Sequence, residues 1–134
     1  MPRYMLDTNI CIYLMRSQPP QVAMRFAACH VGDVVISAIT LAELEFGVIT
    51  SSDRVKARNC VADLIRDIPA LPFDALAAGY YGQVRLATQA PKRDQLDKLI
   101  AAHAMALGVI LVTNNVRDFS AYKGLQIQNW LDDD

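Results

Sequence analysis

The sequence of 134 residues has few of the soft side chains that bind zinc, with three cysteines and two histidines. The cysteines, Cys11, Cys29 and Cys60, form no CxxC pair, and no histidine follows them at a zinc-ligand interval. This spacing excludes a zinc finger or ribbon. An odd number of widely spaced cysteines also argues against a disulfide framework, so we expect all three to be reduced and buried as small apolar side chains.

Long hydrophobic runs are also lacking. The apolar runs are short, such as the four residues 109–112, whereas a helix needs roughly 20 apolar residues to cross a bilayer. The first residues contain neither an apolar signal core nor a small-residue cleavage site. We therefore expect no membrane span and a cytoplasmic location.

An excess of charge of one sign is missing too. Thirteen basic residues balance fourteen acidic ones, for a net charge of −1, so the composition by itself does not indicate a nucleic-acid partner. Apolar residues make up 53% and charged residues 20% of the chain, which excludes a disordered protein. The length fits one domain over residues 1–134, without separate cofactor and substrate domains.

The chain does contain an alternation of short strands and helices. Residues 4–6, 34–36 and 109–112 are continuous apolar or β-branched runs, which are typical of strands covered on both faces of a parallel sheet. Helices are predicted after residue 9, over residues 21–30, 40–49, 55–68 and 74–88, and from residue 97. Gly108 stands where a left-handed helix cap belongs. This order predicts an α/β fold with a mostly parallel central sheet and helices on both faces.

Acidic and carboxamide side chains gather near the predicted carboxyl ends of the strands, where open parallel sheets bind ligands. Asp7 directly follows the first strand, Glu43 lies on the helix after the second, and Asn114 and Asn115 follow the last. Asp97 begins the helix before that last strand, so it reaches the same edge only if the preceding polar loop brings it there. We expect three carboxylates and a carboxamide to converge.

Carboxylates that lie close together repel one another unless a cation or a proton neutralises them. Mg²⁺ or Mn²⁺ prefers oxygen ligands and can promote the attack of water on a phosphodiester. His103 lies six residues after Asp97, about 240° around a helix, so we expect it to lie on the helix surface or to pack, and not to bind the metal. The pattern therefore predicts a Mg²⁺ (or Mn²⁺) site formed by Asp7, Glu43 and Asp97 together with a carboxamide from Asn114 or Asn115.

Several of these residues have simpler interpretations. Asp7 and Asp97 could each serve as the N-cap of a helix, and Asn115 and Asp118 could be turn or cap residues. These roles need no metal, and the sequence leaves them open.

Glu43 has a more specific alternative. Together with Thr40 it matches the TxxE capping box, in which the glutamate folds back on the backbone of the helix start. Glu43 and Glu45 are the only glutamates in the sequence, and two residues of separation place them about 200° apart on a helix. Only one of them can therefore face the predicted site.

Four segments taken together resemble the PIN-domain ribonucleases, and within them the VapC toxins of bacterial toxin–antitoxin pairs. The segments are residues 5–9 (MLDTN), 39–47 (ITLAELEFG), 97–104 (DKLIAAHA) and 111–115 (LVTNN). Asp7, Glu43 and Asp97 match the acidic metal ligands of the family. The last segment often supplies a fourth acid where this chain has Asn115, and Asp118 could supply the missing charge from the neighbouring turn.

The resemblance implies a metal-dependent endoribonuclease whose substrate is an RNA, such as a tRNA cut in its anticodon loop. It also implies a VapB antitoxin as partner and a homodimer. Supporting hydrogen bonds are expected from Thr8, Thr113 and Asn114. The basic residues near the acids, which could position the RNA backbone, are Lys92, Arg93, Lys98 and Arg117.

The main alternative keeps this fold without the catalysis. A PIN domain with Asn115 in place of the fourth acid could be a noncatalytic module that binds RNA or protein. A receiver domain or a haloacid-dehalogenase-like phosphatase fits less well, because each requires a second acid close to Asp7, where this chain has Asn9.

Overall fold

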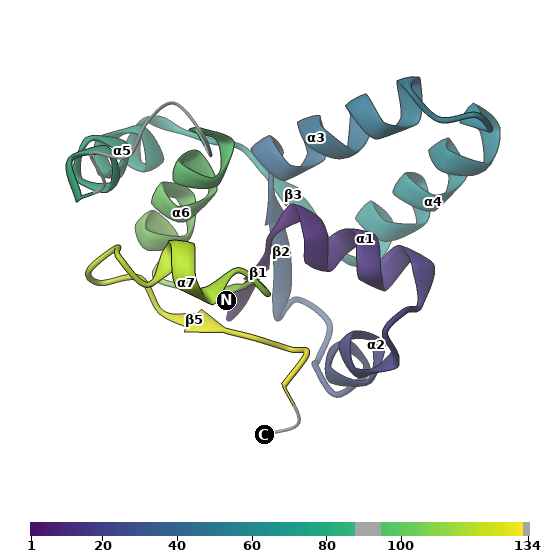
Figure 1. Ribbon diagram of the computed structural model, residues 1–134, viewed down its shortest axis with the longest axis horizontal. Helices are drawn as coiled ribbons and strands as arrows, with labels where there is room; N and C mark the ends of the chain where they lie inside the picture. Colours follow the sequence, from purple (N-terminus) through teal and green to yellow (C-terminus); the bar gives the residue numbers. More distant parts are fainter. Residues whose placement is uncertain (88–94, 133–134) are drawn as a thin grey trace.

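Five parallel strands form the central sheet, in the order β3-β2-β1-β4-β5 (Figure 1). The computed structural model describes residues 1–87 and 95–132. The strands are β1 (Tyr4–Leu6), β2 (Val34–Ser37), β3 (Ala70–Leu71), β4 (Ile110–Val112) and β5 (Ile127–Gln128). The three apolar runs thus form strands as predicted. β3 and β5, of two residues each, were not predicted, because so short a strand leaves no sequence pattern.

Seven helices lie in the described part of the chain. They are α1 (Thr8–Arg16), α2 (Pro20–Ala27), α3 (Ala38–Ile49), α4 (Arg54–Asp67), α5 (Ala75–Ala87), α6 (Gln95–Leu107) and α7 (Val116–Phe119). Four of them start at a side chain that accepts a hydrogen bond from the first turn, namely Asp7, Ser37, Asp53 and Asp74. The four-residue helix α7 was not predicted, and α2 ends three residues before the predicted position 30.

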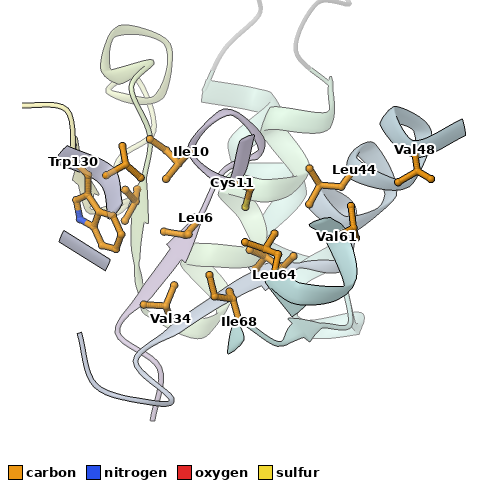
Figure 2. Packing of buried hydrophobic residues seen from close by; sticks show 13 residues of the cluster. Leu6, Ile10, Cys11, Val34, Leu44, Val48, Val61, Leu64, Ile68 and Trp130 are labelled. Carbon is orange, nitrogen blue, oxygen red and sulfur yellow. The ribbon is translucent and has the colours of Figure 1, made fainter. Parts of the chain in front are cut away.

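The two faces of the sheet are covered by different helices. Strand residues alternate, so that Leu6 faces one buried cluster and Met5 faces the other. Helices α1, α2 and α4 pack on one face, and α5, α6 and α7 on the other (Figure 1). Trp130, which is 1% exposed, closes the edge of the first cluster (Figure 2) and packs edge-on against Tyr4.

Helix α6 is buried on almost all sides. Ile100, Ala101 and Ala104, which were predicted to face the core, are completely buried, and so is Ala102. Its alanines allow α5 to pack closely against it. Leu107, by contrast, was predicted on the buried face but is 37% exposed, because it lies in the last turn.

Gly108 adopts a φ of +68° after this helix, as predicted for a left-handed cap, and leads directly into β4.

The cysteines are all free. Cys11 is fully buried as expected, but Cys29 and Cys60 are partly exposed, because Cys29 lies at the margin of the first cluster and Cys60 lines a surface pocket beside Leu64. In the part of the chain that the structure describes, no helix is both long and apolar enough to span a bilayer.

The strand order identifies where a ligand site is expected. From β1 the chain proceeds outward to β2 and β3, and then returns to the other side of β1 for β4 and β5. The direction of winding therefore reverses between β1 and β4. In open parallel sheets, the crevice at the carboxyl ends of such a strand pair is the usual ligand site.

Candidate active site

Asp7 lies in this crevice, at the end of β1. Its backbone N–H donates to the carbonyl of Val112 on β4 (3.0 Å), and its Oδ1 accepts the N–H of Ile10 (2.9 Å), which caps α1. The side chain also accepts a hydrogen bond from Thr113, the residue after β4. Asp7 is 4% exposed. The proposed N-cap role is thus real, and it fixes the carboxylate between the ends of the two strands.

Burial raises the pKa of the Asp7 carboxyl above its usual value, and the nearby negative charge of Glu43 raises it further. The hydrogen bonds from Thr113 and Ile10 oppose this shift, because they stabilise the ionised form. Two acids therefore share a site with little water, which is an arrangement that a bound cation would stabilise. Burial together with the charges of Asp7 and Glu43 also raises the pKa of Cys11, which stays a neutral thiol.

Glu43 reaches the site from α3. Its Oε1 accepts a hydrogen bond from the hydroxyl of Thr8 at 2.6 Å, so the second acid is tied to the residue next to Asp7. The capping-box alternative is wrong, since α3 begins at Ala38 with Ser37 as its N-cap, and Thr40 is already inside the helix.

Glu45 points away from the site, as its position on the helix predicts. It forms an ion pair with Arg58 of α4 at 2.6 Å, and both side chains are exposed. The hydrogen bond from Arg58 lowers the pKa of Glu45. Only one of the two glutamates faces Asp7, which confirms the argument from helix geometry.

Asp97 lies in the first turn of α6, which begins at Gln95, so its interpretation as an N-cap is wrong. The helix runs into β4 through Gly108, and its first turn therefore points toward the carboxyl edge of the sheet, where Asp7 lies. Among the described residues, no group of three or more His, Cys, Asp or Glu side chains is placed to hold one metal ion. The structure pairs Asp7 with Glu43, and the convergence of Asp97 with them stays a prediction.

The segment after β4 contributes polar groups from its backbone and side chains. The Thr113 hydroxyl accepts the N–H of Asn115 (3.0 Å), and the Asn115 amide donates to Asp118 (2.8 Å). This leaves Asn115 Oδ1 as the atom that could face a cation, with the charge of Asp118 beside it. Asn114 donates to the hydroxyl of Tyr13 (3.2 Å), and its own Oδ1 is buried without a hydrogen-bond donor among the described residues.

The basic residues that were predicted to contact RNA differ in their surroundings. Lys98 is only 4% exposed, so its side chain offers little surface, and its contact with RNA stays a prediction. It lies on α6, which its neighbours cover on almost all sides. Arg117 is exposed on α7, whereas Lys92 and Arg93 lie outside the described residues.

His103 packs inside the protein, which is one of the two roles expected for it. It is 2% exposed, its Nδ1 lies 2.8 Å from the Oγ of Ser37, and its ring meets that of Phe73 edge-on. The sequence reasoning did not identify Ser37 as its partner. A serine directly before a helix is a typical N-cap, but this pattern carries no information about a contact 66 residues away.

A groove of about 600 Å³ lies next to the acidic pair, between α1, α3 and α4. Thr8 and Glu43 form its end at the site, Ile12 contributes apolar surface, and Arg16 and Lys56 supply positive charge. An extended or helical segment of a partner could therefore enter the site along this groove.

The available donor atoms fit a hard divalent cation. Asp7 and Glu43 supply carboxylate oxygens, and the Oδ1 of Asn115 can supply an amide oxygen from the neighbouring strand end. Mg²⁺ and Mn²⁺ prefer such oxygen ligands. The imidazole of His103 is used by Ser37, and Cys11 is a buried neutral thiol, so neither favours a softer metal.

Comparison with known proteins agrees with this geometry. Residues 4–125 match the PIN domain. The chain is 38% identical over 132 residues to the tRNA(fMet)-specific endonuclease VapC of Shigella flexneri, covering 97% of this chain and 99% of that protein. It is 34% identical over 133 residues to ribonuclease VapC2 of Haemophilus influenzae, covering 98% of this chain and all of the relative (100%).

Solved structures show the same fold. DNA-bound VapBC from Salmonella typhimurium superimposes with a TM-score of 0.88 at 35% identity, covering 97% of this chain and 99% of that chain. VapBC2 from Rickettsia felis, bound to a promoter DNA fragment, gives a TM-score of 0.86 at 31% identity, covering 95% and 98%. The chain belongs to the PIN domain family and, within it, to the VapC ribonucleases of toxin–antitoxin systems.

Proposed function

We propose that this protein is a Mg²⁺- or Mn²⁺-dependent endoribonuclease that cleaves a tRNA in its anticodon loop and so inhibits translation. A tRNA-specific relative at 38% identity over almost the whole chain supports this substrate class. The observation that carries the proposal is the buried Asp7, paired with Glu43 through the Thr8 hydroxyl at the reversal point of the sheet.

In this proposal Asp7, Glu43, Asp97 and Asn115 hold the cation, with Asp118 adding charge beside Asn115. A bound divalent ion would supply the positive charge that activates water and shields the phosphate during hydrolysis. Thr113 and the first turn of α1 orient the Asp7 carboxylate, and their hydrogen bonds oppose the rise in its pKa that burial causes. Thr8 holds Glu43 in place, and Arg117 is available to bind the RNA backbone.

We also propose that a VapB antitoxin inhibits the enzyme by covering this site, and that the chain forms a homodimer. Relatives at 31–35% identity were solved as VapBC complexes, which supports an antitoxin partner. The groove that ends at Glu43 offers the apolar surface and the basic rim on which a segment of the antitoxin could lie. We expect the protein to act in the cytoplasm as one domain over residues 1–134.

Cleavage of purified tRNA tests the activity. The wild-type protein should cut initiator tRNA in the presence of Mg²⁺ or Mn²⁺ and lose this activity in EDTA, and Asp7→Asn should be inactive under both conditions. Asp53→Asn is a matched control, because Asp53 also caps a helix through its side chain but lies on the exposed start of α4. This variant should cleave like the wild type.

The noncatalytic alternative makes a different prediction. A module that only binds RNA would bind the tRNA equally well with and without metal, would not cleave it, and would bind unchanged after Asp7→Asn. That set of results would overturn the nuclease proposal.

A further inference from the structure

One buried hydrogen bond joins two helices that the proposed site depends on. His103 of α6 is 2% exposed, and its Nδ1 lies 2.8 Å from the Oγ of Ser37, which is completely buried at the end of β2. Either polar side chain would be costly to bury without a hydrogen-bond partner. The bond therefore favours one relative position of the two segments.

The hydrogen-bond pattern indicates how the contact works. Ser37 Oγ already accepts the N–H of Ile39 at 3.0 Å, which caps α3. The serine hydroxyl hydrogen can then be donated to Nδ1 of a neutral imidazole that carries its proton on Nε2. Burial lowers the pKa of His103, which favours this neutral form, although the nearby Asp74 opposes the shift. Phe73 packs edge-on against the ring, with 5.5 Å between the ring centroids.

The bond connects the helices that carry Glu43 and Asp97. Ser37 caps the helix that carries Glu43, six residues further on, and His103 follows Asp97 by six residues on α6. Glu43 is in turn bonded to Thr8, next to Asp7. Helix α3 is thus held to α1 by one side-chain hydrogen bond and to α6 by another.

We propose that His103 is a positioning residue, which sets α6 against α3 through Ser37 and so places Asp97 relative to Glu43 and Asp7. This inference rests on the proposed metal site. The imidazole touches neither substrate nor metal in this role. It acts by limiting how far the first turn of α6 can move from the acidic pair.

Binding of Mn²⁺ to the purified chain, measured by isothermal titration calorimetry, tests the role without RNA. His103→Leu removes the bond and should weaken Mn²⁺ affinity by about 10-fold or more, as for other residues that orient metal ligands. His103→Asn should restore most of the affinity, because its side-chain amide places an acceptor near the position of Nδ1. Ser37→Ala removes the same bond from the other side and also the cap that Ser37 provides for α3, so it should weaken binding at least as much as His103→Leu.

Val84→Ala on α5 is the control for general loss of stability. Val84 is 1% exposed and belongs to the buried cluster that covers α6, but it lies on a different helix from the acids. It should lower the thermal midpoint and leave Mn²⁺ affinity at the wild-type value. Combining Ser37→Ala with His103→Leu should weaken affinity no more than Ser37→Ala alone, because Ser37→Ala already removes the bond to His103 as well as the cap of α3.

Two results would overturn the role of His103. One is a wild-type Mn²⁺ affinity in His103→Leu while Asp7→Asn no longer binds the metal. The other is an equal loss of affinity in His103→Leu, His103→Asn and Val84→Ala. If instead Asp7→Asn binds Mn²⁺ like the wild type, the proposed metal site itself is refuted, and the positioning role with it.

Discussion

Asp7→Asn separates the chemistry of the site from the stability of the fold. Asparagine has nearly the same size as aspartate and is an equally good N-cap. Its Oδ1 can still accept the Ile10 N–H, which keeps the cap of α1. The substitution therefore removes one buried negative charge and little else.

The unfolding free energy of Asp7→Asn at pH 7 should lie within about 1 kcal/mol of the wild-type value. Asparagine keeps the cap, and even complete loss of a Ser, Thr or Asp cap costs only about 1 kcal/mol. Asp7→Ala provides the contrast. It loses the cap, at about 1 kcal/mol, and leaves the buried Thr113 hydroxyl without its acceptor, at a further ~1–3 kcal/mol. Asp7→Asn should therefore be clearly more stable than Asp7→Ala.

The pH dependence has a definite sign. Folding raises the pKa of Asp7 above its ordinary value of 3.8. The native state therefore keeps the proton up to a higher pH than the unfolded chain does. Stability from this group falls as the pH rises from the unfolded pKa through the folded one. Asp7→Asn lacks this loss, so its stability relative to the wild type should increase between pH 3 and pH 7.

Urea unfolding with and without MnCl₂ measures both effects. At a concentration near 100 times its dissociation constant, Mn²⁺ should stabilise the wild type by about 2.7 kcal/mol. Asp7→Asn should show almost none of this stabilisation and should not cleave tRNA. Equal stabilisation of the two proteins by Mn²⁺ would refute the assignment of Asp7 as a ligand.

Three further predictions follow from the same geometry. Glu43→Gln should abolish cleavage in a tRNA assay, whereas Glu45→Gln, which breaks only the exposed pair with Arg58, should retain most of it; an equal loss in both would contradict the helix-face argument. Asp97→Asn should abolish cleavage while far-UV circular dichroism stays unchanged, and full activity would remove Asp97 from the site. Trp130→Ala should lower the unfolding free energy by about 3–5 kcal/mol, since Trp130 is 1% exposed; a change below 1 kcal/mol in urea titration, roughly the size of a surface effect, would show that the C-terminal segment does not stabilise the core.

Much of the fold could be predicted because its signals are local. The strand runs at residues 34–36 and 109–112 are continuous and apolar, and Gly108 has the positive φ that its place after a helix predicted. β3 and β5 could not be predicted, since two residues show no periodicity and pair only because neighbouring strands lie beside them. The start of α3 was misplaced for a related reason. Both Ser37 and Thr40 are good caps, and only the end of β2 determines which of them is used.

Burial on α6 shows a second limit of sequence reasoning. A helix covered by a sheet on one side and by α5 on another has no polar face, so its periodicity cannot show which charged residue is exposed. Lys98 stands next to Asp97 and looks like a surface cation in the sequence, yet it is 4% exposed. The charge of a side chain predicts exposure only where one side of the helix meets water.

Asp7 and Glu43 could be placed near strand ends from the sequence, and the resemblance predicted that Thr8 and Thr113 support them, but the contact of Ser37 with His103 could not be predicted. Thr8, Ser37 and Thr113 each follow or end one of three neighbouring strands, and each hydroxyl bonds to a distant part of the chain. Valine would occupy nearly the same volume as threonine at positions 8 and 113 but lacks the hydroxyl, so it could not form these hydrogen bonds. Parallel strands bring these sequence-distant hydroxyls to one edge of the sheet. There Thr8 bonds to Glu43 and Thr113 bonds to Asp7, which no local sequence motif could arrange.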